Sequence, residues 1–453
     1  MNSQATSLDA YNLFQAGTLA LAQVERNGIR IDVEYCEKMA SHLDRQINKL
    51  NEDFKKSELV KLWRNSYRQK TNLNSGTQLA DILYNRMKLE PIKFTDNGYP
   101  STDEEALEAL NVPEISNLLR IRGLTKVRDT YLKAFLREQV DGIVHCMFNL
   151  NIAKSGRPST EAPNFANVPK RDPEAQRICR QAIKARPGHK IISADFKGVE
   201  VSIGCCYHND PNMISYVSDT SLDMHRDMAM KLFILSLDEV KTCKPIRQTA
   251  KNSFVFPQFY GDWWKSCASS MWINSHLETH RLASGVLLVD HLKSKGYKSL
   301  AQFEKHVEKV ERWMWDDKWG IYTQWKKDWV AEYYKKGYFD MLTGFRCSGI
   351  MDRKQACNYP IQGTAFHVLL QCLIWLVEDA KKEHWDSFVM NQIYDDLCLD
   401  VHPDEERMVI ERLQYYMTDR IRKHWDWINV PFEIDISSTP VDGSWYELKE
   451  LKK

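Results

Sequence analysis

Residues 190–195 read KIISAD, and residues 392–397 read QIYDDL. In each stretch a run with apolar, β-branched residues leads to a carboxylate, Asp195 in the first and Asp395 in the second. Such runs predict buried strands, so each acid is expected at a strand end. Two carboxylates on strand ends can hold a pair of divalent ions about 3.5–4 Å apart, the arrangement used for in-line phosphoryl transfer. We therefore expect a two-metal site at Asp195 and Asp395.

A short basic stretch lies between the two acids. Residues 247–251 read RQTAK, and Phe256, Tyr260 and Gly261 follow closely. Arg247 and Lys251 are four residues apart, which places them on one face of a helix. The forked guanidinium and the point-charge ammonium suit a triphosphate, although an isolated pair of this kind is usually a solvated face. Two acids separated by a basic helix are typical of a nucleotide polymerase.

The composition sets broad limits. A chain of 453 residues is too long for one compact core, so two or three subdomains are expected. The formal net charge of +1 gives no indication of a nucleic-acid partner. We see no apolar run long enough to span a bilayer and no signal peptide, so we expect no membrane and a cytoplasmic location, in a bacterium or a phage-infected cell. The 11 cysteines are scattered without C-x-x-C spacing, which favours free core thiols and argues against zinc.

Periodicity gives a coarse order of elements. Apolar residues at three- and four-residue steps predict one long helix over 31–70, and further helices over 78–86 and 118–135. The segment 101–104, STDE, predicts a helix start. Short strands and loops are expected from 142, helices over 222–338, and a strand–turn–strand over 388–401.

Three further motifs join the acids and the basic helix. Residues 155–160 read SGRPST, residues 195–200 read DFKGVE and residues 358–365 read NYPIQGTA. Together with Tyr394-Asp395-Asp396 and the basic helix, they resemble family A DNA polymerases, the bacterial DNA polymerase I group and its phage relatives, over nearly the whole chain. Several separated motifs in the family's order are a specific signal, whereas one alone would be weak.

The resemblance implies an α+β right-hand polymerase fold, with an antiparallel-sheet palm, helical fingers and a helical thumb. The expected parts are an N-terminal helical region with the thumb (1–150), the first part of the palm (151–220), the fingers (221–350) and the second part of the palm (351–453). The basic segments 55–70 and 120–133 are then expected to lie along DNA phosphates, which positions a duplex without reading its sequence.

The resemblance also implies roles for single residues. The expected catalytic residues are Asp195, Asp395, Asp396 and Lys251. Two Mg²⁺ ions, for which Mn²⁺ could substitute, are expected on Asp195, Asp395 and the backbone carbonyl of Phe196. The expected nucleotide-binding residues are Arg247, Lys251, His225, Glu200, Phe256 and Tyr260. The expected contacts to primer and template are Arg157, Asn358, Gln362 and Lys354.

Glu200 indicates the substrate class. In the DNA polymerases of the family this glutamate fills the space that a ribose 2′-hydroxyl would need, so the expected substrates are dNTPs and primer–template DNA. The implied activity is template-directed extension of a primer 3′-hydroxyl. Two alternatives stay open: a catalytically silent, polymerase-shaped nucleic-acid-binding module, and a relative that also uses rNTPs or RNA templates.

The basic helix departs from the family's spacing by one residue. The family places a phenylalanine eight residues after the arginine and a tyrosine twelve residues after it, positions that hold Val255 and Phe259 here. One extra residue turns a helix by about 100°, which would move Phe256 and Tyr260 off the nucleotide face. We therefore predict a local bulge between Lys251 and Phe256, supported by the helix-breaking Pro257.

Other features of the sequence depart from the family's pattern or stand outside it. Asp396 replaces the family's glutamate, which leaves its role open, and Lys354 replaces an arginine. The tryptophans at 313, 315, 319, 325 and 329 are interpreted as core, with stacking on single-stranded template as the less favoured alternative. No acidic motif of the family's 3′–5′ exonuclease precedes the polymerase motifs, so we expect a monomer that does not proofread by itself, with a separate exonuclease or processivity factor as a partner.

Overall fold

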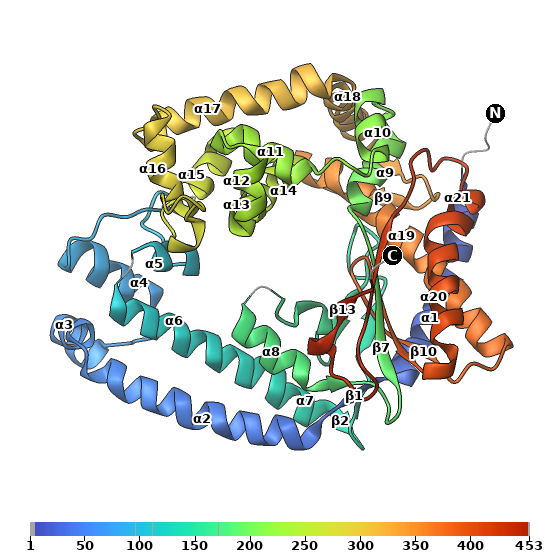
Figure 1. Ribbon diagram of the computed structural model, residues 1–453, viewed down its shortest axis with the longest axis horizontal. Helices are drawn as coiled ribbons and strands as arrows, with labels where there is room; N and C mark the ends of the chain where they lie inside the picture. The colour runs from blue at the N-terminus through green and yellow to red at the C-terminus, as the bar shows by residue number, and fades with distance from the viewer. Residues whose placement is uncertain (1–4, 96, 111, 171, 452–453) are drawn as a thin grey trace. The chain divides into compact units, whose positions relative to one another are not determined.

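The computed structural model describes residues 5–451 apart from 96, 111 and 171. The chain forms two compact units. The first contains Met1–Ser41, Lys126–Thr220 and Trp319–Lys453, and the second contains His42–Thr125 and Ser221–Lys318 (Figure 1). This division has two parts where the sequence predicted four, and it does not test the predicted boundaries, which remain a prediction.

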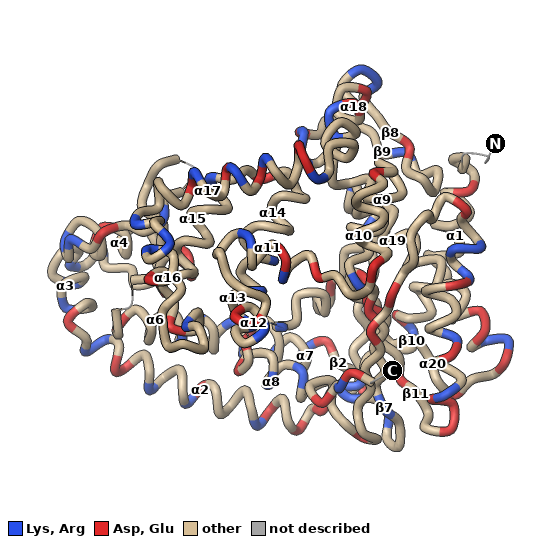
Figure 2. The backbone as a smooth tube through the Cα atoms, turned by 45° about the horizontal axis from the view of Figure 1, so that its top comes forward, with Lys and Arg blue, Asp and Glu red and all other residues tan. Residues whose placement is uncertain are grey.

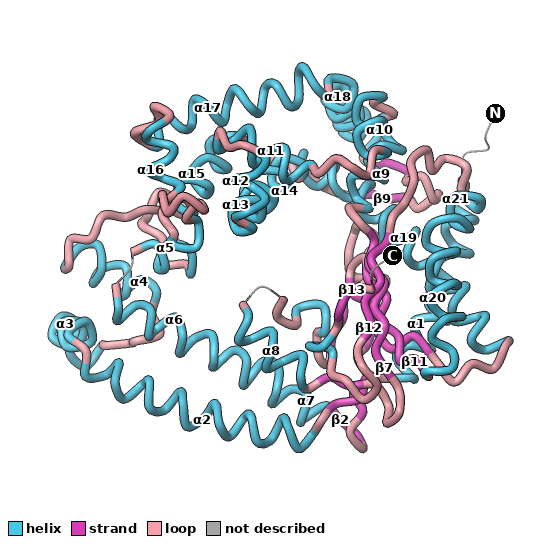
Figure 3. The backbone as a smooth tube through the Cα atoms, viewed as in Figure 1, coloured by secondary structure: helices cyan, strands magenta, loops and turns pink. Residues whose placement is uncertain are grey.

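A five-stranded antiparallel sheet organises the first unit. Its strand order is β10 (Phe388–Ile393), β11 (Asp396–Val401), β7 (Lys190–Phe196), β12 (Ile434–Ser438) and β13 (Lys449–Glu450). Its strands are drawn in magenta in Figure 3. The strands predicted before each acid are confirmed as β7 and β10. The predicted turn is confirmed with one adjustment, because Asp396 is already the first residue of β11. The α+β class with an antiparallel palm-like sheet is thus confirmed for this unit.

Helices pack closely beside this sheet. Helix α19 (Arg353–Lys382) lies against α1 (Ser7–Asn27) and α9 (Val199–His208), and α1 also contacts β10. The approach of α1 to α19 depends on Gly17, since a Cβ there would lie 2.6 Å from Leu370 Cδ2. The 30-residue α19 therefore serves as the central buried helix of the unit.

Helix α19 corrects one expectation. By length and composition alone it is apolar enough to cross a membrane, with a mean hydropathy of 1.4 over its most apolar window. The expectation that no such run exists is therefore wrong. In this protein 83% of that window is buried among other parts of the chain, which is the environment of a core helix.

The second unit is helical, and the segment that runs into it from the first unit does not form the single helix predicted over 31–70. The chain instead forms β1 (Ile29–Ile31), α2 (Val33–Lys56) and α3 (Glu58–Tyr67). Ser57 separates the two helices, because its backbone is extended and its hydroxyl accepts from Val60 N–H as an N-cap. Figure 2 shows Lys and Arg interspersed with Asp and Glu along α2, so this helix has a mixed rather than a purely basic surface.

The remaining helical expectations are confirmed. Asp103 caps α5 (Glu104–Ala109), and α6 (Pro113–Lys126) continues through a π-helical turn, Val127–Leu132, into α7 (Lys133–Glu138). The core interpretation of the tryptophans is confirmed for Trp315 and Trp319, which are buried, and the cysteines, all free, are all buried as predicted.

Candidate active site

Three aspartates, on three neighbouring strands, lie side by side across the sheet. Asp195 on β7 pairs directly with Asp396 on β11 and, on its other side, with Asp435 on β12. Directly paired residues project to the same face of a sheet. Asp435 is held by Lys197, whose Nζ lies 2.7 Å from its Oδ1. The register therefore places Asp396 and Asp435 on either side of Asp195, whereas the predicted partner of Asp195 is Asp395.

Asp395 lies in the tight turn that connects β10 to β11. The residue before it, Tyr394, has a φ of 55°, in the left-handed region that few non-glycine residues adopt. The turn is held by two hydrogen bonds: Gln392 Nε2 donates to the Tyr394 carbonyl at 2.7 Å, and the Phe196 N–H donates to the Asp395 carbonyl at 3.2 Å. These bonds fix Asp395 beside the end of β7.

The carboxylates influence one another's ionisation. Burial raises the pKa of Asp395 above its ordinary value, and the negative charges of Asp195 and Glu200 raise it further. Burial raises the pKa of Asp396 to about 6, against the lowering effect of the Ser193 hydroxyl. A cluster of acids that resists ionisation in this way is a suitable donor set for hard divalent cations, whose charge would reverse the effect.

Ser193 controls the orientation of Asp396. Its hydroxyl Oγ lies 2.7 Å from Oδ1 and 2.8 Å from Oδ2 of that carboxylate. Ser193 stands two residues before Asp195 on β7, so both side chains lie on the same face. The shorter aspartate in the family's glutamate position is thus hydrogen-bonded within the sheet.

Arg157 bonds both to Glu200, the residue expected to block a ribose 2′-hydroxyl, and to α19, the helix that carries the expected DNA contacts. Its Nη2 forms an ion pair with Glu200 Oε1 on α9, and its Nε donates to the Gln362 carbonyl on α19 at 3.2 Å. Close packing holds this loop, because a Cβ on Gly363 would lie 2.1 Å from the Ser155 carbonyl oxygen. Lys354, Asn358 and Gln362 follow at four-residue steps on α19, which places them along one face.

In the second unit, Arg247 is held by Asp223. Helix α13 (Lys244–Ala250) carries Arg247, and Asp223 is the N-cap of α11 (Met224–Phe233). The Arg247 Nε lies 2.7 Å from Asp223 Oδ2, and its Nη2 lies 3.0 Å from Oδ1. This bidentate pair occupies the guanidinium donors on the face where a phosphate is expected.

The predicted bulge is confirmed. Residues Lys251–Val255 form a π-helical turn between α13 and α14 (Phe256–Phe259), and the Phe256 N–H donates to the Lys251 carbonyl five residues earlier. Such a turn accommodates one extra residue in a helix. The widened turn also suits Pro257, which has no N–H to donate.

Because of the bulge, Val255 and Phe259 face the core, and Phe256 lies on the same side of the helix as Lys251. Val255 is fully buried, and Phe259 packs edge-on against Trp315 in the core, with ring centroids 5.5 Å apart. Phe256 instead lies beside Lys251, whose Nζ is 4.9 Å from the ring centroid, and its own centroid lies 6.3 Å from that of Tyr260. Phe256 and Lys251 therefore share a face despite the extra residue.

His225 belongs to the same group. Its ring meets Phe256 edge-on at 5.5 Å, and its buried Nδ1 has no hydrogen-bond partner among the residues that the structure describes. Burial lowers the pKa of His225 to about 4, with contributions from the positive charges of Lys251 and Arg247. The imidazole is neutral at pH 7, and its unsatisfied Nδ1 is a polar atom to which a ligand could bind.

The predicted site residues thus form two groups. The first unit holds Asp195, Phe196, Glu200, Asp395, Asp396, Arg157, Lys354, Asn358 and Gln362, and the second holds His225, Arg247, Lys251, Phe256 and Tyr260. Sequence reasoning missed Ser193, Asp223 and Asp435. Ser193 could have been found from its two-residue spacing to Asp195, and Asp223 from its capping position before His225. Asp435 could not, because its position depends on which strand pairs with β7.

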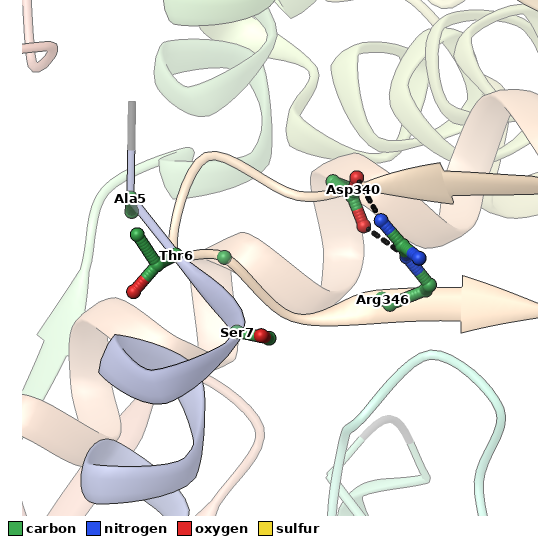
Figure 4. A pocket seen from close by; sticks show the side chains of 6 residues that line it. Ala5, Thr6, Ser7, Asp340 and Arg346 are labelled. Carbon is green, nitrogen blue, oxygen red and sulfur yellow. Dashed lines mark hydrogen bonds and ion pairs between the residues drawn. The ribbon is translucent and has the colours of Figure 1, made fainter. Parts of the chain in front are cut away.

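A pocket elsewhere in the first unit is polar but carries no catalytic group. It has a volume of about 230 Å³ and lies between the start of α1, at Thr6 and Ser7, and the hairpin of β8 (Tyr338–Asp340) and β9 (Arg346–Ser348) (Figure 4). Asp340 and Arg346 pair across this hairpin at 2.7 and 2.9 Å. Their charges satisfy each other, so we assign no function to this pocket.

Comparison with known proteins agrees with this geometry. The sequence model of DNA polymerase family A matches residues 33–447. DNA polymerase I of Bacillus subtilis is 26% identical over 439 residues, covering 95% of this chain and 45% of that protein. The thermostable DNA polymerase I of Thermus thermophilus is also 26% identical, covering 95% of this chain and 47% of that protein. The chain therefore spans less than half the length of these curated relatives.

A solved structure shares the fold. It is described as the POL domain of Pol1 from M. smegmatis in complex with DNA primer-template and dNTP, and it superposes with a TM-score of 0.74 at 23% identity. The match covers 96% of this chain and 70% of that one. From the family match over most of its length, the chain belongs to DNA polymerase family A.

Proposed function

We propose that this chain is a template-directed DNA polymerase that extends a primer 3′-hydroxyl with dNTPs by two-metal-ion nucleotidyl transfer. The observation that carries the proposal is the alignment of Asp195 with Asp396 across β7 and β11, with Asp395 fixed in the adjoining turn. Mere binding of nucleic acid would not require such a cluster of carboxylates whose ionisation is opposed by burial and by one another.

The donor set fits two hard divalent cations. Asp195 and Asp395 would hold them, with the Phe196 carbonyl as a further oxygen ligand. When bound, two Mg²⁺ ions neutralise charge on the phosphates and favour ionisation of the attacking hydroxyl. The Ser193 hydroxyl donates its hydrogen to the Asp396 carboxylate and keeps it within the sheet, which leaves Asp396 as a positioning group rather than as a third ligand.

The second unit supplies the groups for the triphosphate. The Arg247 guanidinium is held by Asp223. Lys251 lies four residues, about one helical turn, further along. The buried Nδ1 of His225 has no hydrogen-bond partner among the described residues. Phe256 lies between His225 and Lys251 and offers a ring face for the nucleotide. Preorganised cations of this kind stabilise the charge that develops on a transferring phosphoryl group.

Glu200 and Arg157 support deoxynucleotides and a primer–template as substrates. Their ion pair holds the Glu200 side chain in place. A side chain must be held in this way if it is to exclude a ribose 2′-hydroxyl by its volume. The same Arg157 and the Lys354–Asn358–Gln362 face of α19 provide donors for the minor groove, where amide side chains can both donate and accept. We further propose that the protein acts in the cytoplasm as a monomer, and its buried free thiols fit a reducing compartment.

A primer-extension assay tests this function. The full chain is incubated with a 5′-labelled primer on a DNA template, Mg²⁺, and either dNTPs or rNTPs. We expect extension with dNTPs only, loss of at least roughly 10³-fold with Asp195→Asn or Asp395→Asn, and wild-type activity for the matched surface control Asp419→Asn. Extension by either active-site variant would overturn the mechanism.

The same assay separates the alternatives. Absence of extension with Mg²⁺ and with Mn²⁺, together with tight binding of the primer–template, would favour a silent nucleic-acid-binding module. Extension with rNTPs or on an RNA template would favour the broader-substrate relative. Trimming of an unpaired labelled 3′ end without dNTPs would contradict the expectation that this chain does not proofread by itself.

A further inference from the structure

A second cluster of ligating side chains lies at the opposite end of the sheet from Asp195. His189 immediately precedes β7, Asp386 lies just before β10, and His402 immediately follows β11. One ligand atom of each residue lies within 4.8 Å of the others. Because β10, β11 and β7 are neighbours, these three ends meet. The length of β7 separates His189 from Asp195, roughly 20 Å, so the cluster is distinct from the catalytic carboxylates.

His189 turns one ring nitrogen towards a buried carboxylate and the other towards this cluster. Its Nδ1 lies 2.7 Å from Asp400 Oδ1, and both side chains are less than a tenth exposed. Two acceptors cannot meet at that distance, so Nδ1 carries the hydrogen and donates it to the carboxylate. The other nitrogen, Nε2, faces Asp386, and the arrangement is that of the carboxylate–histidine–metal sets in which the second ring nitrogen binds the ion.

The distance between His189 Nε2 and Asp386 Oδ2 suits two ligands of one metal ion better than it suits a hydrogen bond. His189 Nε2 lies 3.4 Å from Asp386 Oδ2, longer than the roughly 2.7–3.2 Å of an N–H···O bond. Metal–ligand bonds of about 2.0–2.2 Å in a tetrahedral site place neighbouring ligand atoms about 3.4 Å apart. The two electron-rich atoms are therefore spaced as two corners of a tetrahedral coordination shell.

The surroundings favour a cation. Arg186 Nη1 donates to Asp386 Oδ1 at 2.9 Å, and the Arg186 N–H donates to Asp400 Oδ2 at 2.7 Å. The Arg186 guanidinium lowers the pKa of Asp386 below its ordinary value, so that carboxylate is ionised at neutral pH. The Arg186 guanidinium also lies beside His189, with Nη2 3.2 Å from Nδ1, and this one cation against the carboxylates of Asp386 and Asp400 leaves a net negative formal charge beside the two imidazoles.

His402 completes the set. Its ring centroid lies 5.2 Å from that of His189, with the planes at 75°. Its Nδ1 accepts the Asp404 backbone N–H at 3.3 Å, so binding a metal through Nε2 would exchange this cap for a ring hydrogen on Nδ1, which lies 3.8 Å from Asp404 Oδ2. The Asp386 side chain is 54% exposed, which leaves room for a water molecule in the fourth position.

We propose that His189, Asp386 and His402 form a structural site for a divalent transition-metal cation, with Zn²⁺ as the best fit. Two imidazoles and one carboxylate are borderline donors that suit Zn²⁺ better than Mg²⁺. The scattered cysteines argued against zinc, but this site uses no thiolate. The bound ion joins the ends of three adjacent strands and so stabilises the sheet that carries the catalytic carboxylates.

Calorimetric titration of the full chain with ZnCl₂ tests this site. Excess Mg²⁺ is included to occupy the Asp195–Asp395 pair. We expect one Zn²⁺ per chain, a dissociation constant at least roughly tenfold weaker in both His402→Ala and Asp386→Asn, and no change in the control His384→Ala, an exposed histidine on the loop between α19 and β10. Co²⁺ bound in place of Zn²⁺ should give the visible absorption of a tetrahedral ion in the wild type and in His384→Ala, but not in His402→Ala or Asp386→Asn.

Two outcomes would overturn the proposal: no stoichiometric Zn²⁺ binding, or binding that His402→Ala and Asp386→Asn leave unchanged. Zn²⁺ should also raise the thermal unfolding midpoint of the wild type and not that of His402→Ala. Primer extension by His402→Ala with Mg²⁺ should equal that of the wild type. Its loss would overturn the assignment of this cluster to a separate site, whereas inactivity of both proteins would concern the polymerase proposal alone.

Discussion

Arg247 donates twice to the carboxylate of Asp223, with Nε 2.7 Å from Oδ2 and Nη2 3.0 Å from Oδ1. Asp223 also accepts the backbone N–H groups of His225 and Arg226 at the start of α11. The guanidinium that we expect to bind a triphosphate therefore already holds an anion. An incoming nucleotide and the Asp223 carboxylate compete for the same donors.

Replacing Asp223 by asparagine should release Arg247 while keeping the helix cap, because asparagine is also a strong N-cap. We expect the apparent KM for dNTPs in primer extension to fall about two- to fivefold, which corresponds to the ~0.5–1 kcal/mol of a partly exposed ion pair. Asp227→Asn, which removes one negative charge from the same helix, should change the KM less. A higher KM in Asp223→Asn would mean that the aspartate positions Arg247 for the phosphate.

Ser193→Ala should shift the acidic limb of the pH–rate profile to higher pH. The Ser193 hydroxyl lowers the pKa of Asp396, which burial has raised to about 6, so its removal favours the protonated carboxyl. The measurement is kcat for primer extension between about pH 5.5 and 8.5. Ser437→Ala is the matched control, because Ser437 lies opposite Ser193 on β12. Identical profiles for the two variants would refute a role for the Ser193–Asp396 contact.

Glu200→Ala should permit extension with rNTPs, whereas Glu200→Gln should not. Alanine removes both the volume and the ion pair with Arg157, while glutamine keeps nearly the same volume. We expect dNTP extension to fall in both variants, because Arg157 loses its charged partner, and rNTP extension to rise at least roughly tenfold only in the alanine variant. The readout is the ratio of kcat/KM for dNTP and rNTP. Equal ratios for the two variants would exclude a steric role.

The π-helical turn predicts opposite effects at two adjacent residues. Phe256→Ala should raise the KM for dNTPs with little effect on stability, since the ring lies beside His225 and Lys251. Val255→Ala should lower the free energy of unfolding by roughly 2 kcal/mol and leave the KM unchanged, because Val255 is fully buried. Denaturant unfolding and steady-state kinetics separate these effects. The reverse result would place Val255, not Phe256, on the nucleotide face.

Buried histidines should make the protein sensitive to acid. Burial lowers the pKa of His280 to about 4, below the value of about 6.5 in an unfolded chain. The unfolded state therefore binds the proton first, and stability falls as the pH drops from about 6.5 towards 4. Between about pH 7.5 and 5 this histidine alone should cost about 2 kcal/mol. His280→Gln should reduce the loss by that amount in denaturant unfolding, and an unchanged loss would refute the assignment.

Much of the site could be predicted from local sequence. Asp195 and Asp395 were found because β-branched runs mark the strands that carry them, and Arg247 and Lys251 because four residues return to the same helix face. Even the bulge was predictable, since one surplus residue in a motif of fixed spacing must be absorbed locally. The long helix over 31–70 was predicted wrongly, because a single extended residue at Ser57 ends a helix without disturbing the apolar pattern on either side.

The sequence by itself determined the order of strands, helices and motifs along the chain, because local backbone preferences and side-chain periodicity are written in neighbouring residues. Only the tertiary structure decided which strands are neighbours. That pairing places Asp435 and Asp396 on either side of Asp195, and it gathers His189, Asp386 and His402 at the other end of the sheet. Register between distant strands depends on long-range packing and hydrogen bonding, and no local pattern in one strand specifies its partner.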